Sequence, residues 1–92
     1  MAWTIRLETS AEKDLARLDK PVARRLRDFL KKRVAKLDNP RSIGESLKGL
    51  RFGELWRYRV GDYRIICHIK DTGLVVLALR IGHRKDIYNS RP

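Results

Sequence analysis

Residues 54–64 read Glu54-Leu55-Trp56-Arg57-Tyr58-Arg59-Val60-Gly61-Asp62-Tyr63-Arg64 and predict the central hairpin of the fold. Alternating residues flank Gly61-Asp62, and such a dipeptide between two alternating runs is typical of a two-residue β-hairpin turn. Because successive strand residues point to opposite faces, Trp56, Tyr58 and Val60 share one face, and Leu55, Arg57 and Arg59 share the other. The turn also predicts that Val60 pairs with Tyr63 and that Arg59 lies opposite Arg64.

Two arginines opposite each other in an antiparallel pair repel, so this arrangement needs a compensating interaction. The simplest one is an anion bound between Arg59 and Arg64. Guanidinium groups suit phosphate, because their fork of donors matches its oxygens. The stretch therefore predicts a sheet face that binds phosphate.

The whole chain has 92 residues and a net charge of +11, from 22 Lys and Arg against 11 Asp and Glu. A chain of this length predicts one small domain over residues 1–92, built as one sheet covered on one face by helices. The charge favours a polyanionic partner, nucleic acid first and acidic membrane or protein surfaces second.

Cysteine content and hydropathy predict the compartment. The single Cys67 excludes an intrachain disulfide framework and a cysteine-based zinc site. The sequence shows no apolar run of membrane-spanning length and no signal-peptide core. We therefore expect a protein of the reducing cytoplasm that has no membrane partner.

Two helices are predicted before the hairpin. Residues 2–7 alternate as a short strand, and Thr9-Ser10-Ala11-Glu12 then resembles a capping box, with Thr9 as N-cap. A second helix follows from Pro21 and ends at Asn39-Pro40. Its apolar stripe predicts core packing, and the short connection predicts an antiparallel helical hairpin. The stripe consists of Val22, Leu26, Phe29, Leu30, Val34 and Leu37.

Residues 41–53 are predicted to form a loop, and three strands are predicted over residues 54–60, 63–70 and 74–81. A three-residue turn at Asp71-Thr72-Gly73 would pair Lys70 with Leu74 and Arg64 with Arg80. Arg59, Arg64 and Arg80 would then form a row, with Arg57 on the same face. The opposite face is the predicted core, lined by Trp56, Tyr58, Tyr63, Ile65, Cys67, Ile69, Val75, Leu77, Leu79 and Ile81.

The reactive side chains exclude several classes of enzyme. Two histidines and scattered acids lack the spacing of metal ligands, and there is no glycine-rich phosphate loop. Cys67 points into the predicted core, so it is not a candidate nucleophile. We expect no metal and no cofactor. The remaining groups fit cleavage of RNA by its own 2′-hydroxyl, which needs a base, cations around the phosphorane and an acid.

The residues predicted to carry this chemistry come from the strands and the tail. Arginine supplies cations but does not transfer protons near neutral pH, whereas histidine does. His83 could act as base or acid, or could simply cap the end of a strand; Tyr88 could stack on a base, donate a hydrogen bond or give up a proton. The catalytic candidates are Arg57, Arg64, His83, Arg84 and Tyr88, and the phosphate-binding candidates are Lys48, Arg51, Arg59 and Arg80.

Three motifs resemble the RelE/ParE superfamily of bacterial toxins, and within it the RelE-like branch. The motifs are Leu47-Lys48-Gly49-Leu50, Trp56-Arg57-Tyr58-Arg59-Val60-Gly61-Asp62-Tyr63-Arg64-Ile65 and Ile81-Gly82-His83-Arg84-Lys85-Asp86-Ile87-Tyr88. The order strand, helix, helix, three-strand meander and short tail extends the resemblance over the whole chain. It implies an α+β fold, in which a helical hairpin packs on one face of a small antiparallel sheet.

The resemblance also implies a function. RelE-like toxins bind the ribosomal A site, cleave the mRNA there without a metal and so inhibit translation. A cognate RelB-like antitoxin holds them inactive in a hetero-oligomer. By position, the family's site residues fall on Arg57, Arg64, Arg84 and Tyr88. A second strand lysine of the best-known member falls on Leu55, so a base that relied on that lysine is missing, which makes His83 a stronger candidate for proton transfer.

Two other functions fit the same resemblance. ParE-like members poison DNA gyrase by binding and need no nuclease site, and a non-toxic nucleic-acid-binding module is a third possibility. Tyr88 after the Gly-His-Arg tail, with Arg57 and Arg64 in place, favours RNA cleavage.

Overall fold

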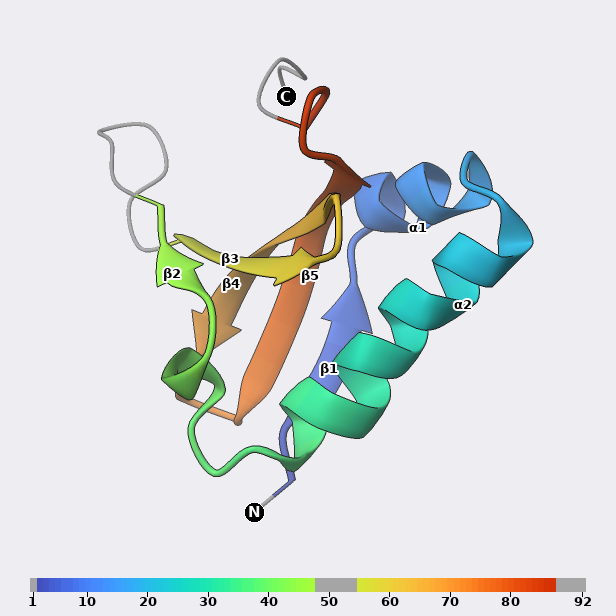
Figure 1. Ribbon diagram of the computed structural model, residues 1–92. Helices are drawn as coiled ribbons and strands as arrows, with labels where there is room; N and C mark the ends of the chain where they lie inside the picture. The colour runs from blue at the N-terminus through green and yellow to red at the C-terminus, as the bar shows by residue number, and fades with distance from the viewer. Residues whose placement is uncertain (1, 48–54, 88–92) are drawn as a thin grey trace.

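The computed structural model describes residues 2–47 and 55–87. Two helices cover one face of a five-stranded sheet, whose strand order is β1-β5-β4-β3-β2 (Figure 1). This arrangement confirms the α+β class and the helical cover on one face. The strands are β1 Thr4–Leu7, β2 Glu45–Ser46, β3 Leu55–Val60, β4 Tyr63–Lys70 and β5 Val75–His83.

The helices differ from their predicted boundaries in detail. Helix α1 spans Thr9–Ala16, but its N-cap is Glu8 and no side chain caps it, so the predicted Thr9 capping box is wrong. Helix α2 spans Lys20–Asp28, with Pro21 in its first turn as predicted. A π-helical turn over Phe29–Arg33 and a 3-10 turn over Val34–Lys36 continue it. In residues 2–47 and 55–87, no helix is long and apolar enough to cross a membrane.

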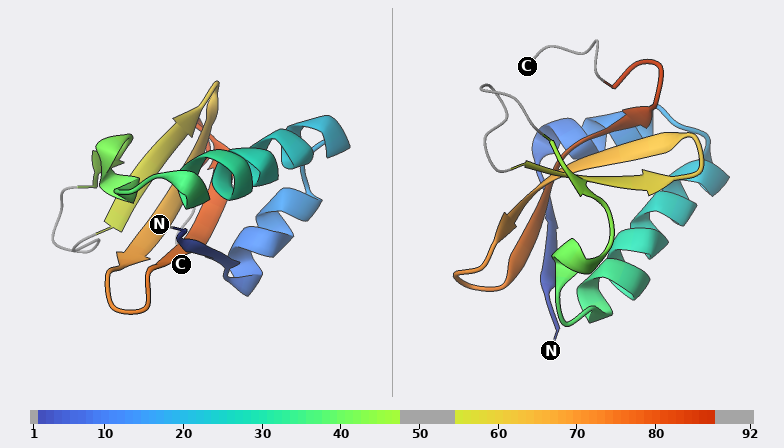
Figure 2. Two further views of the ribbon diagram at one scale, coloured as in Figure 1. Left: turned by 90° about the horizontal axis from the view of Figure 1, so that it is seen from below. Right: turned by 60° about the vertical axis from the view of Figure 1, so that its left-hand side comes forward.

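The helices lie over one face of the sheet in both views of Figure 2, and the core residues pack between them. The stripe of the second helix faces inward, with Leu26, Leu30 and Val34 buried, which confirms its core role. Tyr58, Ile65 and Cys67 are buried beneath them from the sheet, as the alternation predicts. Burial of these side chains is the main force holding the helices on this face.

The sheet has two features that the alternation did not indicate. Strand β1 runs parallel to β5, so the sheet is mixed rather than purely antiparallel. The predicted loop after Asn39-Pro40 contains a 3-10 turn, Pro40–Ser42, and the two-residue strand β2, which pairs with β3 at Arg57 and Trp56. Both pairings join segments far apart in sequence, which local patterns do not encode.

The register between β3 and β4 is the predicted one. Val60 pairs with Tyr63, and Arg59 lies opposite Arg64. Gly61 has a φ of 60°, the left-handed conformation that the two-residue turn requires. This hairpin is thus determined by its own short sequence.

The register between β4 and β5 differs from the prediction. Lys70 pairs with Val75 rather than Leu74, which leaves a four-residue turn with Leu74 at a φ of 52°. A shift of one residue turns every side chain to the other face, so Val76 and Ala78 enter the core in place of Val75, Leu77 and Leu79. A bulge then shifts the register by one more residue, because Ala78 pairs with Cys67 but Arg80 pairs with Ile66. The residues after this bulge return to the faces that the sequence predicts. Ile81 is therefore buried as expected.

Candidate nucleic-acid interface

The face of the sheet opposite the helices carries the predicted arginines of β3 and β4. Across the strands, Arg57 pairs with Ile66 and Arg59 pairs with Arg64. The tail that follows β5 brings Arg84 to the same end of the sheet, beside the Gly61-Asp62 turn. We call Arg57, Arg59, Arg64 and Arg84 the arginine cluster.

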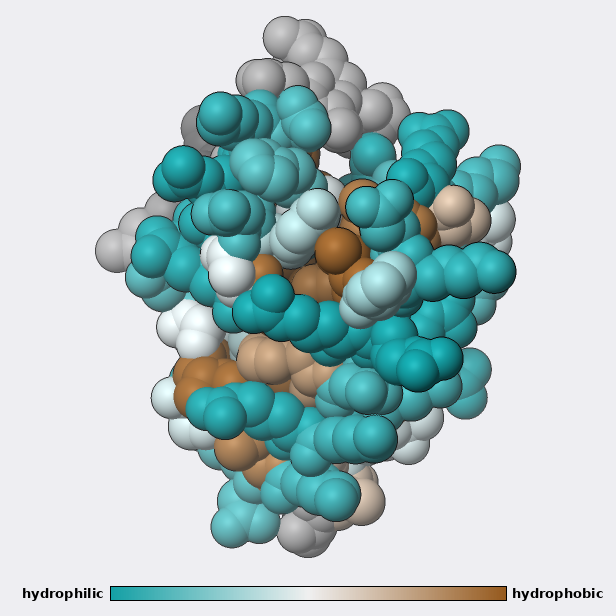
Figure 3. Space-filling view, turned by 45° about the vertical axis from the view of Figure 1, so that its right-hand side comes forward, coloured by the Kyte–Doolittle hydropathy of each residue, from teal (hydrophilic) through white to brown (hydrophobic). Residues whose placement is uncertain are grey.

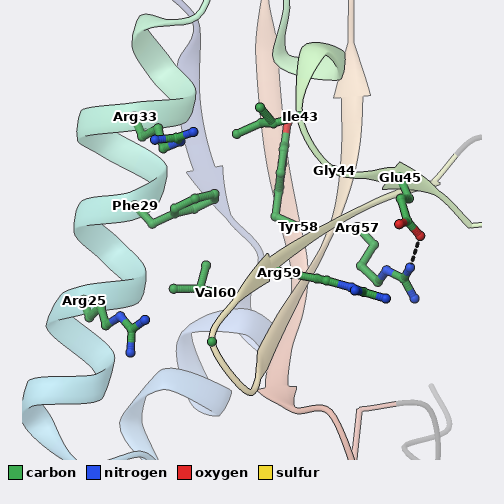
Figure 4. A pocket seen from close by; sticks show the side chains of 11 residues that line it. Arg25, Phe29, Arg33, Ile43, Gly44, Glu45, Arg57, Tyr58, Arg59 and Val60 are labelled. Carbon is green, nitrogen blue, oxygen red and sulfur yellow. Dashed lines mark hydrogen bonds and ion pairs between the residues drawn. The ribbon is translucent and has the colours of Figure 1, made fainter.

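Arg57 forms an ion pair with Glu45 of β2, its neighbour across the two strands. Figure 4 shows this pair, with Arg59 beside it on the side of β3 that faces away from α2. The Arg57 side chain is 17% exposed and that of Glu45 is 59% exposed, so an incoming phosphate would compete with an accessible carboxylate. Arg57 is therefore held in place before any ligand arrives.

Arg59 and Arg64 avoid each other although they lie opposite. Arg59 is exposed and forms no ion pair with any residue in the described part of the chain. Arg64 is nearly buried and folds back over the turn, where its Nη1 donates to the Gly61 and Tyr63 carbonyl oxygens at 3.0 and 2.9 Å. The repulsion between facing arginines is thus relieved by backbone carbonyls.

Arg80 does not join the cluster, so the predicted row Arg59, Arg64 and Arg80 is wrong. The register places Gly82, not Arg80, opposite Arg64. Arg80 Nε instead donates to Asp14 Oδ2 of α1 at 2.9 Å, and Arg80 Nη2 lies 3.3 Å from Asp14 Oδ1. The same carboxylate accepts the Ile81 backbone N–H at 2.8 Å, so Arg80 has a structural partner.

His83 lies on the helix side of the sheet rather than beside the arginines, contrary to the expected placement. Its ring meets the Tyr63 ring edge-on, with centroids 5.5 Å apart, and it lines a pocket with Arg17 and Leu18 at the end of α1. The Lys85 backbone N–H donates to His83 Nδ1 at 3.2 Å. A neutral imidazole with its proton on Nε2 satisfies this bond.

Arg84 is exposed and attached to the β3–β4 turn. Its backbone N–H donates to the Asp62 carbonyl oxygen at 2.7 Å, and its Nε lies 3.7 Å from the Asp62 carboxylate. Tyr88, Lys48 and Arg51 lie outside the described residues. Arg57, Arg59 and Arg64 therefore share one face of the β3–β4 hairpin, and Arg84 is bonded to its turn. Arg80 binds Asp14 and His83 packs on Tyr63, so both are separated from them.

The sequence reasoning missed three acidic residues that bind the predicted arginines. Glu45, Asp14 and Asp62 bind Arg57, Arg80 and Arg84, respectively. Asp62 could have been found, because it belongs to the predicted turn next to the tail. Asp14 and Arg80 are 66 positions apart, and no local pattern connects them.

Comparison with known proteins gives the chain a family. The family described as "ParE toxin of type II toxin-antitoxin system, parDE" matches residues 5–88. Toxin RelG of Mycobacterium tuberculosis is 31% identical over 88 residues, which cover 96% of this chain and 98% of that protein.

Solved structures share the fold. A chain of the toxin–antitoxin complex RelBE2 from M. tuberculosis superposes with a TM-score of 0.82 at 28% identity, over 94% of this chain and 95% of that one. A mutant of the E. coli toxin RelE in the free state has a TM-score of 0.73 at 19% identity, over 97% and 93% of the two chains. The chain therefore belongs to the RelE/ParE family of toxins of type II toxin–antitoxin systems.

Proposed function

We propose that this protein is a RelE-like toxin that cleaves mRNA in the ribosomal A site and so inhibits translation. The reaction uses the 2′-hydroxyl of the RNA and no metal. The observation that carries the proposal is the arginine cluster, in which Arg57, Arg59 and Arg64 share one face of the β3–β4 hairpin and Arg84 is bonded to its turn. The guanidinium groups of Arg57, Arg59 and Arg84 suit a scissile phosphate that gains negative charge in the transition state.

The arginines have distinct tasks in this reaction. Arg59 and Arg84 are exposed and meet the RNA backbone first. Arg57, freed from Glu45 by the incoming phosphate, contacts the reacting phosphoryl oxygens, and Arg64 keeps the turn rigid beneath it. None of them transfers a proton at neutral pH. Base and acid must therefore be other groups, and His83, Tyr88, the ribosome and the RNA are candidates.

A role for His83 in proton transfer is testable because it requires a movement. Its ring packs on Tyr63 and its Nδ1 accepts the Lys85 N–H, so the tail has to turn before the imidazole reaches the arginine cluster. If His83 is the base or acid, His83→Gln lowers the single-turnover cleavage rate by about a hundredfold or more and changes the pH profile. A wild-type rate with an unchanged profile would assign proton transfer to another source, such as Tyr88, the ribosome or the RNA.

Comparing Tyr88→Phe with Tyr88→Ala separates the effect of the Tyr88 hydroxyl on the cleavage rate from that of its ring.

We further propose that a cognate RelB-like antitoxin neutralises the toxin in a cytoplasmic hetero-oligomer. Similar chains occur in toxin–antitoxin complexes from M. tuberculosis, at 28% identity, and from Pyrococcus horikoshii, at 27% identity. The exposed cations of this chain also favour an acidic protein partner.

Gyrase poisoning of the ParE type is the second candidate, and two observations favour it. The matching family is described as a ParE toxin, and His83 faces away from the arginine cluster. Tightly controlled expression, followed by primer extension on a translated message, separates the two functions. Ribosome-dependent cuts in the message support mRNA cleavage, whereas a covalent complex of gyrase with cleaved DNA supports the second candidate.

A further inference from the structure

The second histidine of the chain, His68, lies on the face of the sheet opposite the helices. It belongs to β4, whose residues Cys67 and Ile69 pack in the core beneath the helices. Because side chains alternate along a strand, His68 shares the opposite face with Arg64. Of the two histidines, His68 therefore lies on the face of the arginine cluster, whereas His83 lies on the helix side.

The register between β3 and β4 brings His68 next to Arg57. His68 pairs with Leu55, and Arg57 pairs with Ile66, so His68 and Arg57 are diagonal neighbours on adjacent strands. The Cα atoms of diagonal neighbours on one face lie about 7–8 Å apart, which is within reach of long side chains. A phosphate bound by the Arg57 guanidinium would therefore lie beside the imidazole of His68.

The His68 ring is available to a ligand. It is partly exposed, and within the described part of the chain it forms no hydrogen bond and no ion pair. Its partners on the two adjacent strands, Leu55 and Leu77, have apolar side chains that offer no donor and no acceptor. A neutral imidazole carries a proton on one ring nitrogen and a lone pair on the other, so a proton acceptor stays open. By contrast, His83 Nδ1 accepts the Lys85 N–H.

The charged groups around His68 are mostly basic. Lys70 follows it on the same face of β4, and Arg57 lies diagonally on β3, where it forms its ion pair with Glu45. Arg6 lies two strands away on β1. Such cations suit the phosphates of a nucleic acid but stay protonated at neutral pH, whereas histidine accepts a proton there.

Polarity alone does not mark His68 as functional. Hydrophilic side chains also surround small apolar patches on the helix side of the molecule (Figure 3). What distinguishes His68 is its position beside Arg57. A base for RNA cleavage must lie next to the bound phosphate, because the attacking 2′-oxygen belongs to the nucleotide on the 5′ side of that phosphate. His68 meets this requirement, whereas His83 meets it only after the tail has turned.

We propose that His68 is the general base of RNA cleavage, an inference that rests on the cleavage reaction proposed above. The neutral imidazole takes the proton of the 2′-hydroxyl, and the 2′-oxygen attacks the phosphorus. The bond from phosphorus to the 5′-oxygen breaks, and that oxygen takes a proton from water. The products are a 2′,3′-cyclic phosphate and a 5′-hydroxyl, and the imidazolium returns its proton to the solvent.

The pH dependence of cleavage tests this role. His68→Gln keeps a polar side chain but removes titration near neutrality, so single-turnover cleavage of a ribosome-bound message should slow by about a hundredfold or more. The wild-type rate should fall below about pH 6.5, where a histidine base becomes protonated. This limb of the profile should be missing in His68→Gln. A limb that disappears in His83→Gln but persists in His68→Gln would overturn the proposal and assign the base to the tail.

A neighbouring lysine provides the matched control. Lys70 is exposed on the same face of the same strand. Lys70→Gln removes a charge that can contact phosphate, so RNA binding should weaken, but the limb near pH 6.5 should remain. Circular dichroism and ribosome binding establish that both variants fold and dock. A His68→Gln variant that docks and cleaves at the wild-type rate refutes the assignment.

A modified message separates a base from an acid. Sulfur in place of the scissile 5′-oxygen gives a thiolate leaving group, which departs without needing a proton donor. Loss of a base persists on this message, so His68→Gln should stay about a hundredfold slower than the wild type. Equal rates of the two proteins on the sulfur-containing message would show that His68 donates a proton instead, and would overturn its role as base.

NMR of the wild type tests the placement without any substitution. A 2′-O-methyl RNA oligonucleotide cannot be cleaved by this route. Its addition to toxin that has been released from the antitoxin complex and refolded should shift the imidazole signals of His68. Shifts at His83 alone, or at neither histidine, would overturn the placement of RNA beside His68.

The same measurements distinguish this inference from the proposed function. Wild-type protein that makes no ribosome-dependent cut refutes both the cleavage reaction and its base. Wild-type protein that cuts the message, with a rate and a pH profile that do not depend on His68, refutes only the base.

Discussion

At the scale of single residues, the site is defined by how each arginine is held. Arg57 is paired with an accessible carboxylate, Arg64 with two backbone carbonyls, and Arg59 extends into solvent. A guanidinium bound to Glu45 can exchange that partner for a phosphate, whereas Arg64 gives up turn contacts if it moves. The same residue type therefore has separate tasks at neighbouring positions.

Arg57 and Glu45 give the first prediction at this scale. Arg57→Ala should lower the cleavage rate by about a hundredfold or more, because it removes a cation from the developing charge. Its free energy of unfolding should change by about 1 kcal/mol or less, since the pair is partly exposed. Single-turnover cleavage and urea denaturation measure the two quantities. Glu45→Ala, the matched control, breaks the same pair but should keep or raise the rate; a loss equal to that of Arg57→Ala would mean that the pair acts only structurally.

Tyr58 gives a prediction for alkaline pH. Its buried hydroxyl donates to the Pro40 carbonyl oxygen at 2.6 Å, and burial raises the pKa of Tyr58 above its ordinary value of 10.0. Because the folded-state pKa is the higher one, the neutral phenol stabilises the fold below pH 10. This contribution is lost as the pH rises from there toward the folded-state pKa.

Replacing Tyr58 with Phe should remove that pH dependence. At neutral pH, Tyr58→Phe should lower the free energy of unfolding by about 1 kcal/mol, the value of one hydrogen bond. Above pH 10 the stability of the wild type should fall more steeply than that of the variant, measured by urea denaturation. Both proteins contain Cys67 and the same lysines, so those contributions cancel. If the stabilities of the wild type and the variant fall in parallel above pH 10, ionisation of the Tyr58 phenol does not affect folding.

At the scale of elements, one bulge in β5 decides which tail residue meets the arginine cluster. Without the extra residue between Ala78 and Arg80, Gly82 and Arg84 would share the core face of Ala78, and His83 would share the uncovered face. With it, Ile81 and His83 point toward the helices and Arg84 reaches the β3–β4 turn. Asp14 of α1 binds both Arg80 and the Ile81 N–H, so it anchors this bulge.

Asp14 is therefore predicted to be a positioning residue for the tail. Asp14→Ala should lower the free energy of unfolding by about 2–4 kcal/mol, because it leaves a half-buried guanidinium and an N–H without their acceptor. NMR shifts at Gly82 and His83 should report the displaced tail, and cleavage should fall although Asp14 binds Arg80 and the Ile81 N–H rather than the arginine cluster. Asp14→Asn keeps an acceptor for the Ile81 N–H, so its free energy of unfolding should fall less than that of Asp14→Ala. Unchanged Gly82 and His83 signals in the alanine variant would exclude this role.

Across the whole molecule, basic side chains differ in whether a nearby carboxylate neutralises them. Nearby carboxylates bind Arg57, Arg80 and Arg84, whereas Arg24 and Arg27 on α2 are exposed. The net charge of +11 makes binding of RNA strongly dependent on salt, because each neutralised phosphate releases counterions. Binding of a protein partner that also buries apolar surface is weakened less by salt, because only its charged contacts are screened.

This difference predicts how two binding reactions respond to salt. Between about 50 and 200 mM salt, affinity for an RNA oligonucleotide should fall by a factor of roughly a thousand if six or more phosphates are contacted. Antitoxin affinity should fall much less, because apolar burial does not depend on ionic strength. Titration calorimetry or fluorescence anisotropy measures both. If the toxin and antitoxin separate completely at moderate salt, the prediction that apolar burial contributes to their interface is wrong.

Elements whose contacts are local could be predicted from the amino-acid sequence. The two-residue turn sets the β3–β4 register, and helical spacing identifies Leu26, Leu30 and Val34 as core. Arg57, Arg59, Arg64 and Arg84 could be assigned to one surface from the hairpin and the tail that follows β5. Each of these features depends on residues a few positions apart, which is the range over which turn chemistry and periodicity operate.

The rest of the site depends on contacts between residues far apart in the sequence. The slip of one residue between β4 and β5, the parallel β1 and the side on which His83 lies all follow from contacts across the chain. Asp14 fixes the bulge from 66 positions away, and a shift of one residue exchanges the two faces of a strand. Periodicity identifies which residues alternate, but the face that each set occupies depends on the partner strand and on the helix that anchors it.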